Sequence, residues 1–177
     1  MSEEQRQKEK ISRILMTVLV CITVLSVCIA VRAVYLRKTK VVLAPDHAPA
    51  VEANAETIEE TDEEKLEQPE GGGAVGLTYS PEVTIAKKRK KAKLLFANPS
   101  RSNQDLIVQI VIQDTVIVQS GLLKLGNQVT SLDIPDTSML QTGTYEGSFV
   151  IYYYYPENGE KAIVNSEMPI HITVVDQ

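Results

Sequence analysis

The side chains with the greatest potential for chemistry are two histidines and two cysteines, the only ones of either kind in the 177-residue chain. A metal site or a catalytic base needs such side chains, or several carboxylates, brought together at one place. His47 stands in an acidic stretch, and His171 alternates with Ile170 and Ile172, which should place it on the outer face of a strand. Serine and threonine residues occur without a nucleophile–base motif. The sequence therefore predicts no catalytic, metal-binding or cofactor-binding site, and a protein that is not an enzyme.

Cys21 and Cys28 both lie in an apolar stretch, seven residues apart and hence on one face of a helix. The rest of the chain has no thiol, so we expect no disulfide in it. The simplest interpretation of the two cysteines is that they are small residues of a membrane helix. Palmitoylation, or a face for helix dimerisation, is the alternative.

Five consecutive basic residues form a candidate anion-binding site: Lys87, Lys88, Arg89, Lys90 and Lys91, with Lys93 beyond them. They stand between two segments of alternating hydrophobicity, so we expect an exposed hairpin tip. Such a tip suits a polyanion, for example a wall polymer, lipid headgroups or the chain's own acidic stretch. The alternative is a solvated loop that protects a sheet edge. A nucleic acid is not expected as a partner, because no aromatic residues are interleaved with the basic ones.

Two tyrosines are a second candidate binding surface. Tyr152 and Tyr154 alternate with Phe149 and Ile151, so they should lie on the opposite, exposed face of a strand. Tyrosine offers a large rigid contact area with a polar tip, which suits a binding surface. Strand propensity alone is the other explanation for them.

The sharpest local pattern is Leu140-Gln141-Thr142-Gly143-Thr144-Tyr145. This spacing predicts a tyrosine corner, in which the Tyr145 hydroxyl group bonds to the backbone just upstream. Gly143 and Tyr145 are thus expected to have structural roles. The position two after Tyr145 is Gly147 rather than a cysteine, so the expected fold has no disulfide between its sheets and no core tryptophan.

From Leu77 onward the hydrophobic pattern has a period of two, which is typical of half-buried strands. A very short connection is expected at Asp114, and Asn158-Gly159 predicts a hairpin. About seven strands follow, with no helical period, and we predict an all-β, immunoglobulin-like β-sandwich at residues 77–177. The residues expected to point inward are Val83, Ile85, Ala92, Leu94, Phe96, Leu106, Val108, Ile110, Ile112, Val116, Val118, Val129, Leu132, Ile134, Tyr145, Phe149, Ile151, Tyr153, Met168, Ile170, Ile172 and Val174.

Ahead of this domain, 18 residues from Ile14 to Val31 carry no charge. A helix of this length spans about 27 Å, close to the ~30 Å hydrocarbon core of a bilayer. We therefore predict a tail at residues 1–13 and a transmembrane signal-anchor helix with its flank at residues 14–36. Cleavage as a signal peptide near Ala33 and lipidation of Cys28 are the alternatives.

Between helix and domain, residues 37–76 are rich in Ala, Pro and Glu. Residues 46–70 alone hold ten acidic residues against one lysine, a net charge of −9. We expect an acidic, disordered linker, because like charges repel and few side chains are available for a core. The basic residues that flank the apolar stretch are balanced, four on each side, so they do not orient the helix. By analogy with common surface proteins, we place the C-terminal domain outside the cell.

Three motifs occur over roughly residues 77–175: Phe96-Ala97-Asn98-Pro99, Ser120-Gly121-Leu122-Leu123-Lys124-Leu125-Gly126 and the Gly-x-Tyr corner. In these motifs the domain resembles the C-terminal part of small single-pass surface proteins of Gram-positive bacteria. These motifs are turn chemistry, so the resemblance implies a β-sandwich and nothing about activity.

Together these features predict a non-enzymatic binding or assembly module in a bacterial cell membrane, anchored by one helix, with its domain outside the cell. Its expected partners are the membrane and a protein or a cell-wall polyanion; the oligomeric state stays open. The alternative is an accessory subunit of a multi-protein envelope machine, for secretion or conjugation.

Overall fold

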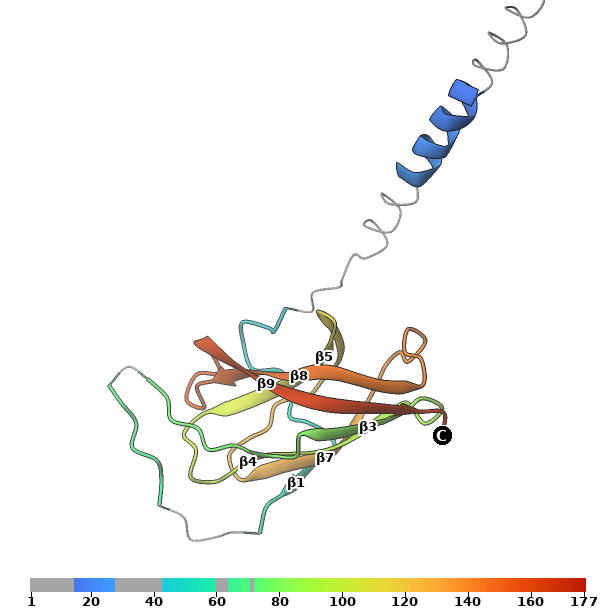
Figure 1. Ribbon diagram of the computed structural model, residues 1–177. Helices are drawn as coiled ribbons and strands as arrows, with labels where there is room; N and C mark the ends of the chain where they lie inside the picture. Colours follow the sequence, from blue (N-terminus) through green and yellow to red (C-terminus); the bar gives the residue numbers. More distant parts are fainter. Residues whose placement is uncertain (1–14, 28–42, 60–63, 71) are drawn as a thin grey trace, which may run out of the picture. The chain divides into compact units, whose positions relative to one another are not determined.

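The computed structural model describes residues 15–27, 43–59, 64–70 and 72–177. The chain divides into two compact units, Met1–Thr39 and Lys40–Gln177. Figure 1 shows the helix of the first unit and the β-sheet of the second.

In the first unit, residues 15–27 form an α-helix. The hydroxyl groups of Thr23 and Ser26 each donate a 2.8 Å hydrogen bond to the carbonyl three residues earlier, so both are satisfied within the helix. Among the described residues, no helix is both long and apolar enough to cross a membrane. Residue 14 and residues 28–36 of the predicted signal-anchor segment lie outside the described residues, as does the predicted tail at residues 1–13.

The described part of the second unit contains nine strands, which confirms the prediction of a mostly β domain. Eight of them form one path in the order β1-β7-β4-β3-β9-β8-β5-β6, and β2 pairs with β4 beside this path. All pairs are antiparallel except β3 and β9, which run parallel. The strands are β1 (Ala55–Thr57), β2 (Thr78–Tyr79), β3 (Glu82–Ala86), β4 (Lys91–Asn98), β5 (Asp105–Ile112), β6 (Thr115–Gln119), β7 (Asn127–Asp133), β8 (Gly143–Tyr154) and β9 (Lys161–Val175).

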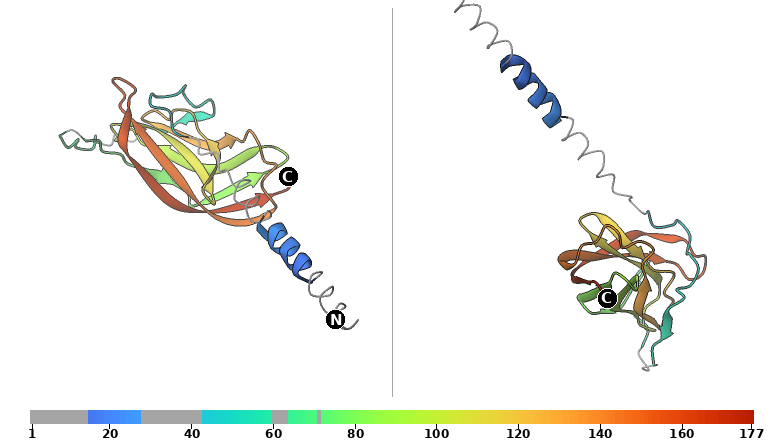
Figure 2. Two further views of the ribbon diagram at one scale, coloured as in Figure 1. Left: turned by 90° about the horizontal axis from the view of Figure 1, so that it is seen from above. Right: turned by 90° about the vertical axis from the view of Figure 1, so that its right-hand side faces the viewer.

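The sheet curls around one hydrophobic core (Figure 2). Phe96 in β4 and Phe149 in β8 are fully buried, and their rings meet edge to face at 5.3 Å, although three steps of the strand order separate the two strands. The predicted inward residues are buried in this core with three exceptions: Val116, Tyr145 and Met168 are only half-buried. Alternating apolar side chains thus predicted the inner face, because one face of each strand has to leave water.

The expected short connection after β5 is a two-residue turn. Gln113 and Asp114 have φ angles of 47° and 60°, the left-handed pair that a tight hairpin requires. β8 and β9 are joined through a longer loop that contains Asn158 and Gly159, where Gly159 has a φ of 70°.

The prediction of a disordered linker at residues 37–76 is wrong for the residues of that range that the structure describes. Residues 43–52, which we call the strap, are bonded to β8 and β9. The Tyr154 hydroxyl group donates to the Pro45 carbonyl at 2.9 Å. The Lys161 ammonium group donates to the Ala44 carbonyl at 3.0 Å and to the Asp46 carboxylate at 2.9 Å, and this last bond lowers the pKa of Asp46.

Backbone hydrogen bonds hold the other end of the strap. The Leu122 N–H group donates to the Ala50 carbonyl at 2.9 Å, and the Glu52 N–H group donates to the Leu122 carbonyl at 3.0 Å. A Cβ atom on Gly121 would lie 2.7 Å from the Glu52 Cα atom, so only glycine allows this approach. Beyond the strap, β1 pairs with β7 from Ala55↔Val129 onward.

The described residues between 64 and 76 are also attached, to the loop between β4 and β5. The Leu66 N–H group donates to the Arg101 carbonyl at 2.9 Å, and the Gly76 N–H group donates to the Ser102 hydroxyl oxygen at 3.0 Å. Acidic composition did not prevent this order, because backbone groups make the bonds while most carboxylates stay in water. The compact unit thus begins at Lys40 and not at residue 77.

Candidate functional site

The strongest candidate site is the basic turn, residues 87–91, between β3 and β4. Residues 87–90 form the turn, in which Lys90 has a φ of 52° and donates its N–H group to the Lys87 carbonyl at 3.2 Å. The side chains of Lys88, Arg89, Lys90 and Lys91 are exposed, and Lys87 is half-buried. The predicted hairpin tip is thus present.

Neighbouring segments fix the backbone of the basic turn. On one side, the Lys87 N–H group donates to the Val175 carbonyl at 3.0 Å, and those of Lys88 and Arg89 donate to the Gln177 carbonyl at 3.0 and 3.3 Å. On the other side, the Lys90 carbonyl accepts from Ile134 at 2.7 Å and the Lys87 carbonyl accepts from the Thr137 hydroxyl group at 3.1 Å. The cations therefore project from a preorganised loop, which reduces the entropy lost on binding a ligand.

Two of the cations already have carboxylate partners. Lys88 pairs with Asp176 at 3.1 Å and Lys91 pairs with Asp133 at 2.9 Å. The hydrogen bond from Lys91, with a further one from Asn54, lowers the pKa of Asp133. These aspartates are distant in sequence from the basic run, so only the strand register could have revealed them.

Three cations remain for an external anion. Among the described residues, no carboxylate lies within ion-pair distance of Arg89, Lys90 or Lys93. Lys93 is exposed on β4 and lies in register between Thr84 of β3 and Ser131 of β7. Residues paired across strands share a face, so Thr84 and Ser131 lie on either side of Lys93 on this face. This arrangement suits phosphate or carboxylate groups.

Glu56 and Glu59 of the predicted acidic linker do not cover the basic turn. β1 carries Glu56 along β7 toward Gln128, and the Ile58 N–H group donates to the Gly126 carbonyl. Lys91 is paired with Asp133, at the other end of β7. The expected contact between acidic linker and basic tip is therefore not made by Glu56 or Glu59; residues 60–63 lie outside the described residues.

The expected exposed tyrosine surface is wrong for Tyr154. This side chain is fully buried in a second small core with Ala44, Ile107 and Leu122, and Tyr152 is half-buried against it. Burial raises the pKa of Tyr154 to about 12. The strap covers this face, since the outer faces of β5 and β8 carry too much apolar surface to stay in water.

The tyrosine corner is present as the spacing predicts. The Tyr145 hydroxyl group donates to the Gln141 carbonyl at 2.9 Å. Gly143 has a φ of 151°, and a Cβ atom added to it would meet no atom within 4 Å. The exposed Tyr145 bond connects the start of β8 to the loop before it. It has a structural role and offers no reactive group.

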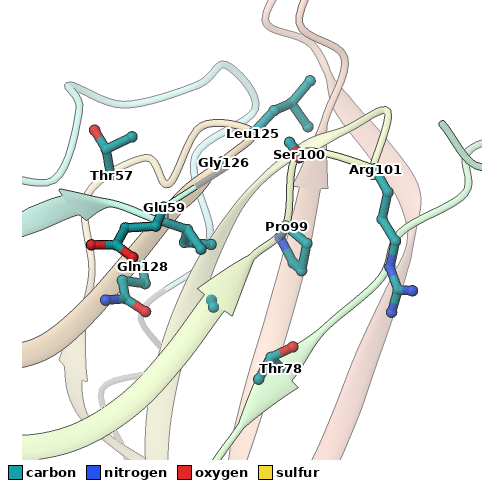
Figure 3. Close-up of a pocket in the computed structure, with 11 residues that line it drawn as sticks. Thr57, Glu59, Thr78, Pro99, Ser100, Arg101, Leu125, Gly126 and Gln128 are labelled. Carbon is teal, nitrogen blue, oxygen red and sulfur yellow. The ribbon is translucent and has the colours of Figure 1, made fainter. Parts of the chain in front are cut away.

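A pocket of about 280 Å³ lies where β4 ends, opposite the basic turn (Figure 3). Glu59 and Gln128 lie on one side and Arg101 on the other, with Pro99 and Leu125 between them. No nucleophile–base pair stands in this lining. This pocket could not be predicted from local sequence, because its walls come from β1, β2, β4, β7 and the connections β4–β5 and β6–β7.

The remaining titratable groups do not gather into a reaction centre within the described residues. His171 is exposed and contacts the Glu146 carboxylate at 3.0 Å, and His47 forms an isolated bridge with Glu160. No group of three or more His, Cys, Asp or Glu residues that could hold a metal ion occurs in the described ranges. Asp105 is buried, and burial raises its pKa, but its Oδ1 atom accepts from the Leu125 N–H group at 3.2 Å. That carboxylate thus serves the loop before β7.

No protein-family model matches this sequence, and no curated protein matches it. Among solved structures, the chain is similar to AggA, the major subunit of aggregative adherence fimbriae type I from Escherichia coli. The sequence identity is 11% and the TM-score is 0.28, over 64% of this chain and 100% of that chain. A similarity of this size carries no inference about function, so the resemblance to Gram-positive surface proteins stays a prediction.

Proposed function

We propose that this chain is a membrane-anchored, extracytoplasmic and non-enzymatic module for binding or assembly in a bacterial envelope. The uncharged run from Ile14 to Val31 supports an anchor, because a stretch of 18 apolar and uncharged residues is long enough to cross a bilayer. The compact β unit, Lys40–Gln177, follows this anchor in the chain.

The proposal assigns an immunoglobulin-like sandwich to the β unit. β7, β4 and β3 would form one layer and β9, β8, β5 and β6 the other, joined by the parallel pair of β3 and β9. The Tyr145 corner at the start of β8 supports this assignment, since such corners mark the corresponding strand of these domains.

The observation that carries the binding function is the basic turn, whose backbone is fixed while three nearby cations have no described carboxylate partner. Its ligand is a polyanion, such as a phosphate-bearing wall polymer. Each exposed ion pair stabilises a complex by at most about 1 kcal/mol, so three give at most about a hundredfold in affinity. Binding should weaken as the salt concentration rises, because added salt shortens the screening length below the ~8 Å of physiological buffer.

Inorganic polyphosphate is a suitable probe for the full chain in detergent. The triple variant Arg89→Ser, Lys90→Ser and Lys93→Ser should lose about 10- to 100-fold in affinity. Lys124→Ser removes an exposed cation from the β6–β7 connection, away from the basic turn. It lowers the net charge by the same amount as the single variant Arg89→Ser, so a comparison of these two controls for net charge. Equal binding by the triple variant and the parent would leave the turn a solvated loop and remove this function.

A further inference from the structure

β9 carries an exposed apolar bulge near its start. Tyr152 pairs with Asn165 and Tyr154 pairs with Lys161, so two steps along β8 correspond to four along β9. The extra residues include Ile163, which is 103% exposed, and Val164, which is 66% exposed. Among the described strands, β3 pairs with β9 only from His171 to Val175, so the start of β9 has one open edge. Such edges are normally protected by charged residues or proline. Two large aliphatic side chains at a bulge therefore need an explanation.

The bulge lies beside the point where the chain enters the unit. Lys161, two residues before Ile163, donates its ammonium group to the Ala44 carbonyl at 3.0 Å. Leu43, which precedes Ala44 in the chain, is 81% exposed. We call Leu43, Ile163 and Val164 the apolar corner.

The length of the preceding chain limits how far the apolar corner can lie from a bilayer. Residues 32–42 separate the last residue of the uncharged run from Leu43, and 11 residues span at most about 40 Å. Four of them are basic, namely Arg32, Arg37, Lys38 and Lys40. Such a juxtamembrane cluster is attracted to anionic headgroups, which draws the corner closer.

The opposite end of β9 is flanked by cations, because it lies beside the basic turn. Val175 and Gln177 hold the basic turn, and 12 residues of strand between Ile163 and Val175 correspond to about 40 Å. Figure 1 shows β9 running from the β8–β9 hairpin to the C-terminus beside β3. The two ends of β9 therefore differ: exposed aliphatic side chains lie at one end and the cations of the basic turn at the other.

We propose that the apolar corner inserts into the interface of the bilayer that anchors the chain, so that the β unit rests on the membrane with its basic turn pointing away. The bilayer is the occupant because the chain emerges at this corner. The polar neighbours Glu157, Asn158 and Glu160 of the hairpin loop are exposed and would lie at headgroup level. This inference rests on the membrane anchor of the proposed function.

The chain contains no tryptophan, so a single introduced one reports on its own surroundings. We would reconstitute the full-length Ile163→Trp variant into phosphatidylcholine–phosphatidylglycerol vesicles and measure its emission with and without brominated lipids. The expected result is a shift to shorter wavelength and quenching by the brominated chains. Leu43→Trp should behave alike. Adding Val164→Asp to Ile163→Trp should reverse both effects.

Met139→Trp is the matched control, because Met139 is 72% exposed and lies just before β8, at the end that holds the basic turn. Its emission should stay that of an indole in water. Flotation with the vesicles separates the two proposals. A chain that floats while Trp at 163 and at 139 emit alike overturns the inference and leaves the anchor intact. A chain that does not float overturns both.

Discussion

Asp105, a carboxylate buried at the start of β5, is the single described residue whose charge most affects the stability of the fold. Its Oδ1 atom accepts a 3.2 Å hydrogen bond from the Leu125 N–H group, yet burial raises its pKa, which means that the charged form is disfavoured in the fold. Because the folded-state pKa is the higher one, the folded state binds the proton more tightly. The free energy of unfolding therefore rises as pH falls through the folded-state pKa, down to the unfolded value near ~3.9.

We predict that Asp105→Asn at pH 7 leaves the protein as stable as the parent or makes it more stable. The amide oxygen keeps the bond to Leu125, while the cost of burying a charge disappears. Asp105→Ala should lower the free energy of unfolding by about 1–3 kcal/mol, because a buried N–H group loses its partner. Denaturant titrations at pH 7 and near the unfolded pKa would measure this. An advantage of Asn that persists unchanged at the lower pH would contradict the explanation.

Tyr145 is the second residue whose role can be measured. Its hydroxyl group donates to the Gln141 carbonyl at an exposed site, so water can replace the lost partner in a Phe variant. We expect Tyr145→Phe to lower the free energy of unfolding by about 0.5–1.5 kcal/mol. Tyr155→Phe is the control, since that side chain is half-buried in the same unit. An unchanged denaturation midpoint for Tyr145→Phe would show that the corner is not a stabilising contact.

At the element scale, the strap and β1 belong to the folded unit. The strap covers Tyr154 and Ile107, which are fully buried, and β1 covers the outer edge of β7. A fragment without them would expose a second apolar face and an unpaired strand edge, both of which favour aggregation.

We therefore predict that residues 40–177 fold as a stable soluble fragment, whereas residues 77–177 are less stable and self-associate. Gel filtration and thermal unfolding of the two purified fragments would test this. The matched variant is Tyr154→Ser with Ile107→Ser in the shorter fragment, which should reduce self-association by making the uncovered face polar. Two fragments of equal stability would mean that the strap is a passive extension.

The strands could be predicted from sequence and the strap could not, for a physical reason. Alternation marks a strand because one whole face of it must leave water, as at Val83 and Ile85. The strap instead depends on a few backbone bonds and on a glycine across the chain, Gly121, and local composition reports neither. One signal was available. The run from Leu106 to Ile112 is apolar on both faces except for Gln109, which is typical of a strand that is covered twice.

The same holds for the candidate site, of which one part could be predicted from the sequence and another could not. The position and exposure of the basic turn follow from the sequence, because a charged run between two alternating segments must form a hairpin tip. The partners that neutralise Lys88 and Lys91 do not, since Asp176 and Asp133 reach them only through the register of the sheet.

For the whole molecule, the proposed function depends on the side of the membrane on which the β unit would lie. Four basic residues precede the uncharged run and four follow it within a few positions, so charge does not orient the helix. The proposed function needs the unit outside, where wall polyanions are found. Orientation is therefore the prediction on which the function depends most.

We predict that an impermeant maleimide labels a cysteine at the basic turn in right-side-out membrane vesicles. Lys90→Cys is a suitable position, because that side chain is exposed and has no described ion pair. Cys21 and Cys28 are first replaced by serine. Ser2→Cys in the same background should be labelled only in inverted vesicles, since a single span places the two ends of the chain on opposite sides. The reverse pattern would put the β unit inside the cell and exclude wall polymers as its ligands. Labelling of both positions in right-side-out vesicles would instead show that the chain does not cross the membrane.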